Sequence, residues 1–144
     1  MKDNLYSARP LAGWYWLGAA ASLVFALCAC ALYVMHVTAD PAALPLDQRT
    51  VFAAEPSWVV SAFGLGAAAA FAASLMLLFR RRLAQPLMLV SLVAMIGWVG
   101  GLVAVPGLRE VISANDLAVA IIVVVLDWTI FWFARHSGQR GWLR

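Results

Sequence analysis

Four long apolar runs constrain this chain more than any other feature of its sequence. They cover residues 11–36, 57–79, 84–105 and 117–134, and a helix needs about 20 residues to cross a hydrocarbon core of roughly 30 Å. Backbone groups in hydrocarbon must be satisfied internally, so a span is either a helix or a strand of a closed barrel. Barrel strands alternate apolar and polar residues, whereas "GLGAAAAFAASLMLLF" is continuously apolar. The sequence therefore predicts an all-α membrane protein, a bundle of four transmembrane helices with antiparallel neighbours.

The composition agrees with lipid as the main solvent. Hydrophobic residues make up 65% of the 144 residues and charged residues 12%, against about 45–50% and about 25% in soluble domains. The net charge of +3 does not indicate nucleic-acid binding, because the basic residues flank the spans and form no long run. The lipid bilayer is the partner that the composition itself implies.

The basic residues predict how the chain is threaded, because Lys and Arg favour the cytoplasmic side of short loops. An inside N-terminus leaves only Arg49 and Arg109 outside. It places eight basic residues in the cytoplasm: Lys2, Arg9, Arg80, Arg81, Arg82, Arg135, Arg140 and Arg144. Both termini are therefore predicted to be cytoplasmic.

The segments between the spans complete the predicted organisation. They are a cytoplasmic N-terminus at 1–10, a periplasmic loop at 37–56, a cytoplasmic basic turn at 80–83, a second periplasmic loop at 106–116 and a cytoplasmic tail at 135–144. Asn115 is placed to cap the fourth span, and Arg80, Arg81 and Arg82 in the basic turn fix topology and can attract anionic lipid headgroups.

The first outer loop contains the pattern of a short surface helix in "LPLDQRTVFAAEP". Asp47 is the expected N-cap and Pro56 the stop. The apolar face, Val51 and Phe52, should press toward the bilayer or the bundle. The polar side chains Gln48, Arg49 and Glu55 should face water.

A small-residue stripe marks the second span as the main packing helix. Ala62, Gly66, Ala70 and Ser74 recur every four residues, which lets another helix backbone approach closely. Gly97 and Gly101 form a shorter version on the third span. The stripe serves either packing inside the bundle or association with a second copy.

Residues 33–95 carry a resemblance to a known family. The shared features are "YVM", the "DQRTVF" element with Asp47, Gln48, Arg49 and Phe52, the "PSWV" that contains Trp58, a second helix of small residues, and a basic turn leading into Pro. In these features the chain resembles a family of small four-helix inner-membrane proteins of bacteria, often labelled sugar transporters. The resemblance implies a bacterial inner-membrane location. The chain departs from the family at Leu32, where the family carries an acidic residue.

Asp127 is the candidate functional residue of the membrane interior, since it interrupts "LAVAIIVVVLDWTIFWFARHSGQR". A charged Asp at a helix centre costs about 2.5–3.5 kcal/mol and usually faces a partner inside the bundle. Ser91 on the third span and Ser74 on the second lie at a similar depth and can supply a hydroxyl. Three interpretations remain open: an interhelical or intersubunit contact, a proton-coupled carboxyl, and a position reached by water.

The residue pattern does not indicate a haem site, a metal site or an enzyme active site. His36 and His136 fall at opposite faces of the membrane and cannot share a haem. No His, Cys and carboxylate cluster has metal-ligand spacing, and Cys28 and Cys30 lie within the first span as packing residues. We expect no cofactor, no metal and no enzyme activity. The expected function is that of an accessory subunit or homo-oligomer acting through intramembrane contacts, with a small-solute or proton-coupled transporter as the alternative.

Overall fold

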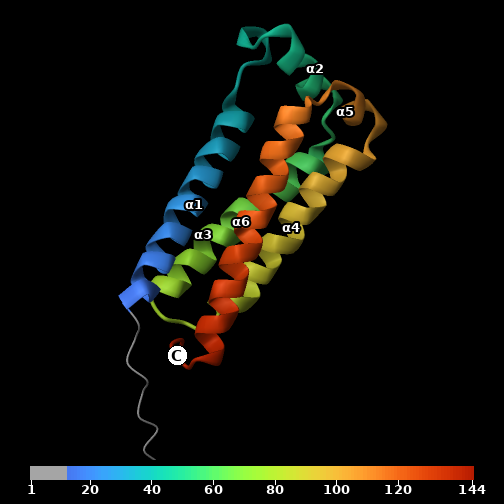
Figure 1. Cartoon of the computed structure of the whole chain (residues 1–144). Helices are drawn as coiled ribbons and strands as arrows, with labels where there is room; N and C mark the ends of the chain where they lie inside the picture. Colours follow the sequence, from blue (N-terminus) through green and yellow to red (C-terminus); the bar gives the residue numbers. More distant parts are fainter. Residues whose placement is uncertain (1–12) are drawn as a thin grey trace, which may run out of the picture.

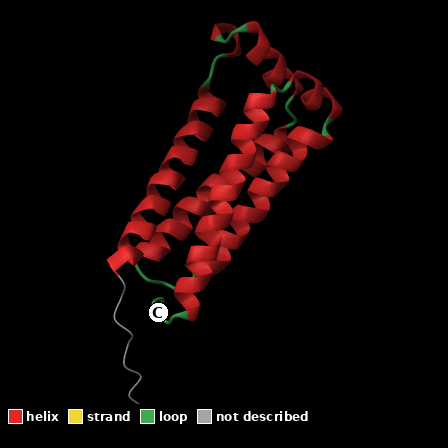
Figure 2. Cartoon of the chain, in the orientation of Figure 1, coloured by secondary structure: helices red, strands yellow, loops and turns green. Residues whose placement is uncertain are grey.

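The structure is a computed structural model that describes residues 13–144. The predicted N-terminal segment 1–10, with Lys2 and Arg9, lies outside the described residues. The helices are α1 (Gly13–Thr38), the 3-10 helix η1 (Pro41–Ala43), α2 (Leu46–Ala54), α3 (Ser57–Leu78), α4 (Ala84–Ala104), α5 (Pro106–Val111) and α6 (Ala114–Gln139) (Figure 1). Residues 13–144 contain no strand (Figure 2).

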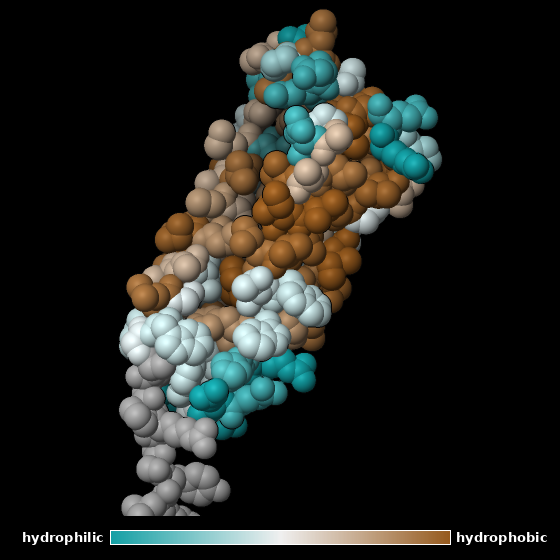
Figure 3. All heavy atoms as spheres, in the orientation of Figure 1, coloured by the Kyte–Doolittle hydropathy of each residue, from teal (hydrophilic) through white to brown (hydrophobic). Residues whose placement is uncertain are grey.

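Four of these helices, α1, α3, α4 and α6, are long and apolar enough to cross a membrane. Figure 3 shows their side chains as a hydrophobic band between two hydrophilic ends. The chain is thus a multi-pass membrane protein, and the predicted all-α four-helix class is confirmed. One end of the bundle carries the turn 80–83 and residues 135–144; we call it the basic end. The other end carries α2 and α5, and we call it the acidic end.

The four long helices form an open row and do not close into a ring. α3 packs against both α1 and α4, α4 packs against α6, and α1 has little contact with α6. Successive long helices run in opposite directions (Figure 1). The row therefore leaves a seam between its first and last helices.

Small side chains bring α1 and α3 together. Ala19 and Ala26 of α1 and Ala70 and Ala73 of α3 are fully buried in one cluster, so the two backbones can approach closely. At the basic end of this interface, the Tyr15 hydroxyl donates a 2.6 Å hydrogen bond to the Leu77 carbonyl.

The predicted small-residue stripe lies in the middle of the row. Gly66, Ala70 and Ser74 are buried and Ala62 is half-buried, so the chain's own helices cover the stripe. A Cβ on Gly66 would come within 3.0 Å of the Met95 side chain of α4. The stripe therefore serves packing inside the bundle, the first of the two predicted uses.

The prediction that Gly97 shares a packing face with Gly101 is wrong. Gly101 is buried against Trp58 and Val59 of α3, but Gly97 is exposed and a Cβ there would meet nothing within 4 Å. The helical period does not separate the two, because they lie only about 40° apart around α4; Trp58 and Val59 cover Gly101, and nothing covers Gly97.

The loops at the acidic end differ in detail from their predictions. α2 begins at Leu46 with Pro45 as its N-cap, so Asp47 stands in the first turn and is not the cap. The loop 106–116 contains a further helix, α5, with Pro106 in its first turn, where the missing N–H costs nothing. Contacts between α2 and α5 cover this end of the bundle.

The last helix is longer than the predicted span 117–134. Ser113, and not Asn115, is the N-cap of α6, because its hydroxyl accepts a hydrogen bond from the Asp116 N–H. At the other end α6 continues to Gln139. The extra turns carry the helix beyond the apolar run at both ends.

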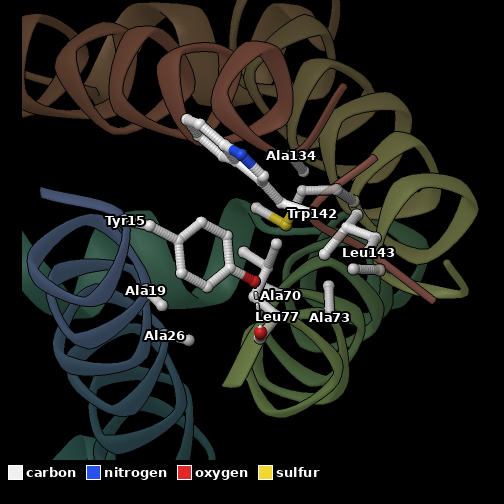
Figure 4. Close-up of a cluster of buried hydrophobic side chains, with 11 residues drawn as sticks. Tyr15, Ala19, Ala26, Ala70, Ala73, Leu77, Ala134, Trp142 and Leu143 are labelled. Atoms are coloured by element: carbon white, nitrogen blue, oxygen red, sulfur yellow. Dashed lines mark hydrogen bonds between the residues drawn. The ribbon is translucent and has the colours of Figure 1, made fainter. Parts of the chain in front are cut away.

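The last residues of the predicted tail fold back onto the bundle. Gly141, at φ +71°, reverses the chain, and Trp142 and Leu143 are then 4% and 2% exposed. Figure 4 shows both side chains in the buried cluster with Tyr15. The Arg80 Nε donates a 2.8 Å hydrogen bond to the Trp142 carbonyl, so the basic turn holds the C-terminal segment against the bundle.

Candidate functional site

Asp127 lies between α6 and α4 and is fully buried. The Ser91 Oγ of α4 is 3.1 Å from each Asp127 carboxyl oxygen. The same Oγ is 3.0 Å from the Gly66 carbonyl oxygen of α3. One hydroxyl therefore links the carboxyl of α6 to the backbone of α3.

The number of hydrogens decides which form of the carboxyl fits this arrangement. Ser91 has one hydroxyl hydrogen to donate, yet three oxygens surround it. A neutral Asp127 donates its own O–H to Ser91, and Ser91 then donates to the Gly66 carbonyl. With a neutral carboxyl two hydrogens thus serve two of the three contacts, whereas an ionised carboxyl competes with Gly66 for a single hydrogen.

Of the two serines predicted to lie near Asp127, the structure places Ser91 against the carboxyl and Ser74 away from it. The Ser74 hydroxyl is buried and has no hydrogen-bond partner among the described residues. The water-reached interpretation of Asp127 is wrong, since the side chain is 0% exposed. Among residues 13–144 no cation pairs with Asp127, because the single ion pair in this part of the chain joins His36 and Glu55.

A second polar group lies in a cavity of about 170 Å³ at the acidic end. Phe63 and Trp98 stack with ring centroids 4.6 Å apart and form an aromatic wall of this cavity. Its polar lining residues are His36, Glu55 and Asp116. The volume is below the roughly 300–1,000 Å³ of typical ligand pockets, so the cavity has room only for a very small molecule.

His36 and Glu55 join α1 to the end of α2. The His36 Nε2 is 2.9 Å from the Glu55 Oε2, and the Glu55 side chain is 7% exposed. Burial raises the pKa of the Glu55 carboxyl, while the adjacent His36 acts in the opposite direction. The prediction that Glu55 faces water is therefore wrong. Sequence reasoning missed this pair because the two residues meet only after the loop 37–56 folds back over α1.

The other residues of the predicted outer-loop element lie outside the cavity. Gln48, Arg49 and Asp47 are exposed, and the Arg49 guanidinium donates hydrogen bonds to the Leu44 and Ala42 carbonyls of its own loop. Phe52 stacks on the His36 ring with centroids 4.3 Å apart. Trp58 is 52% exposed and lies over Gly101. The element therefore shapes the loop and supports the cavity from outside.

The seam between α1 and α6 contains a groove of about 370 Å³. Its α1 wall is formed mainly by small residues, and its α6 wall by large ones; the lining residues are Gly18, Ala21, Ser22, Phe25, Leu126, Thr129, Ile130 and Phe133. The Ser22 and Thr129 hydroxyls donate to carbonyls of their own helices, Gly18 and Val125. The groove therefore offers apolar contact and no free hydrogen-bond donor.

The basic turn combines one structural arginine with two exposed ones. Arg80, at φ 57°, binds the C-terminal segment, while Arg81 and Arg82 are exposed. Within residues 13–144 no three His, Cys, Asp or Glu side chains are grouped so as to hold a metal ion.

No protein-family model, no curated protein and no solved structure matches this chain. The family resemblance of residues 33–95 stays a prediction.

Proposed function

We propose that this protein is a non-enzymatic subunit of the bacterial inner membrane, with both termini in the cytoplasm, that acts through contacts within the bilayer. The observation that carries the proposal is the groove between α1 and α6. A transmembrane helix of a second chain, either another copy or a different subunit, inserts its side chains there.

Two properties of the groove support a helix as its occupant. Ala21 is exposed on the α1 wall and carries only a methyl group, and small residues let a partner backbone approach in a membrane. α1 also has only a weak second neighbour within the chain, because it packs mainly on α3 and touches α6 little. A partner helix completes the row of helices on that side.

A groove-filling variant tests the proposal. We expect the tagged wild type, purified from native membranes in mild detergent, to emerge as a complex of defined mass and composition. Ala21→Phe should lose the partner because the new ring occupies the groove. The matched control is Val93→Phe, at a 62% exposed position of α4 outside the groove, which should keep the partner.

The purification has informative alternatives. A complex of identical chains identifies a homo-oligomer, and a second polypeptide at fixed stoichiometry identifies an accessory subunit. A monomeric wild type, or a complex that both variants retain, contradicts the proposed use of the groove.

A second candidate function is a proton-coupled small-solute carrier that works as an oligomer. It is favoured by the placement of the acidic-end cavity and Asp127 on one helix: Ala120 lines the cavity and lies about 10 Å along α6 from Asp127. Uptake of a panel of small sugars into proteoliposomes, driven by a pH gradient, tests this candidate. Uptake by the wild type that disappears in Asp127→Asn favours the carrier; no gradient-driven uptake of any tested sugar counts against it.

A further inference from the structure

The basic end carries a charge that nothing in the described chain neutralises. Six arginines lie there, and no Asp or Glu of residues 13–144 does; the arginines are Arg80, Arg81, Arg82, Arg135, Arg140 and Arg144. Figure 3 shows the hydrophilic surface of this end directly below the hydrophobic band. Cations at this position face the headgroup layer of a membrane.

Arg135 is the arginine that also borders apolar hollows. Two surface cavities, of about 460 and 350 Å³, meet along α6 and share Phe131, Arg135 and Gln139 as lining residues. These three residues follow one another at intervals of four, so they form a single ridge on the helix. The ridge puts the Arg135 guanidinium and the Gln139 amide at the headgroup level and the Phe131 ring on the bilayer side.

The two hollows differ from a purely polar surface site. One reaches α4 at Pro86 and Leu89, and the other passes along α6 beside Trp128 and Trp132. Both therefore extend from Arg135 toward the hydrocarbon. A ligand that fills them needs an anionic group and long apolar chains.

The Arg135 guanidinium is free to bind such an anion. Its side chain is exposed, and within the described chain it makes no ion pair or hydrogen bond. Gln85 fixes the backbone at this point, because its Nε2 lies 3.4 Å from the Ala134 carbonyl oxygen and 3.5 Å from that of Arg135. An arginine presents several N–H donors in a planar fork that matches a phosphate.

We propose that the groove between α4 and α6 at the basic end binds one anionic phospholipid. Arg135 and Gln139 bind its phosphate, and the acyl chains lie along Leu89, Phe131 and Trp128. The site extends from the α4–α6 groove onto the outer face of α6 and does not depend on the α1–α6 groove.

Lipid titration of the whole purified protein tests the site. Native mass spectrometry counts the lipids retained when phosphatidylglycerol or phosphatidylcholine of equal chain length is added. We expect the wild type to retain one phosphatidylglycerol in preference to phosphatidylcholine, and Arg135→Gln to weaken that binding about fivefold. Arg81→Gln removes the same charge from an exposed turn position and should change the binding less than about twofold.

A second variant separates a lipid site from a site for free phosphate. Leu89→Trp fills the acyl groove at a 47% exposed position and leaves every charge unchanged, so it should weaken phosphatidylglycerol binding. Equal retention of the two lipids overturns the proposal, as does equal loss in Arg135→Gln and Arg81→Gln. Binding that Leu89→Trp does not weaken and that inorganic phosphate displaces indicates a free-anion site and also overturns it.

Discussion

Asp127 shows how a single buried carboxyl is accommodated without a counter-ion. The Ser91 hydroxyl stands between its carboxyl oxygens and the Gly66 carbonyl. A neutral carboxyl and one hydroxyl then satisfy each other across three helices, which avoids the cost of about 2.5–3.5 kcal/mol for a charged Asp in the membrane centre. Interhelical hydrogen bonds of this kind contribute about 0.6–2 kcal/mol each.

Three substitutions test this arrangement. Ser91→Ala should lower the free energy of unfolding by about 1–3 kcal/mol, because it leaves the buried carboxyl without a partner. Asp127→Asn should change it by less than about 1 kcal/mol, since the amide can still donate to Ser91. The control is Ser74→Ala, whose buried hydroxyl has no partner to lose. Unfolding in mixed detergent measures all three, and equal losses in Ser91→Ala and Ser74→Ala would contradict the assignment.

The pair of His36 and Glu55 gives the acidic end a predicted pH dependence. Burial raises the pKa of Glu55. The Glu55 carboxyl therefore holds its proton more strongly when α2 is docked than when the loop is open. Docking is therefore most stable at low pH and weakens as the pH rises from about 4.3 through the raised pKa. Asp116 across the cavity adds like charge to that of an ionised Glu55.

Hydrogen exchange of the α2 amides, corrected for the intrinsic rate, measures this dependence. Protection should fall with rising pH in the wild type and change much less in Glu55→Gln. Glu110→Gln, which removes an exposed carboxyl of α5, should follow the wild type. A wild-type slope retained in Glu55→Gln would assign the effect to another group.

Among the helices, α3 is the one on which the packing depends. It touches both α1 and α4 and uses alanine and glycine on the buried sides, so helix contacts here rest on close backbone approach. The exposed faces of the four helices make no such close contacts within the chain, so larger side chains should fit there.

Two glycines of the same predicted packing set distinguish these faces. Gly66→Leu should destabilise the bundle by about 1–3 kcal/mol through overpacking, because a Cβ at this position already meets Met95 at 3.0 Å. Gly97→Leu should be tolerated, since the position faces open space. Thermal unfolding of the purified variants compares their stabilities. Similar losses of stability at both sites would contradict the assignment of Gly66 to a buried face and Gly97 to an exposed one.

At the scale of the whole molecule, charge is separated between the two ends. Asp40, Asp47, Glu55, Glu110 and Asp116 lie toward the acidic end, and six arginines lie at the basic end. Because basic residues favour the cytoplasmic side, the basic end should be cytoplasmic. A reporter fused after Arg144 should be active only in its cytoplasmic form, and a reporter inserted beside the exposed Gln48 only in its periplasmic form. The reverse pattern would overturn the threading.

The sequence by itself determined the class, the number of spans and the separation of charge. These properties depend on the length and apolarity of local runs, since hydrocarbon admits only segments that satisfy their own backbone groups. The ends of the helices were harder to predict from the sequence. Asp47 and Asn115 are plausible N-caps, yet Pro45 and Ser113 occupy the N-cap positions. Ser and Asn are about equally good N-caps, so cap preference does not choose between Ser113 and Asn115, and Pro45 makes no side-chain cap at all.

Only the tertiary structure decided which polar and small residues meet. Counting residues from the membrane surface placed both Ser91 and Ser74 at about the depth of Asp127. The rotation of α3 and α4 about their axes brought only Ser91 to the carboxyl. The pairing of His36 with Glu55 and the burial of Trp142 arise from chain reversals that no helical period encodes. In apolar helices nearly every face is hydrophobic, so amphipathic periodicity cannot report rotation, and side-chain fit between neighbouring helices sets it instead.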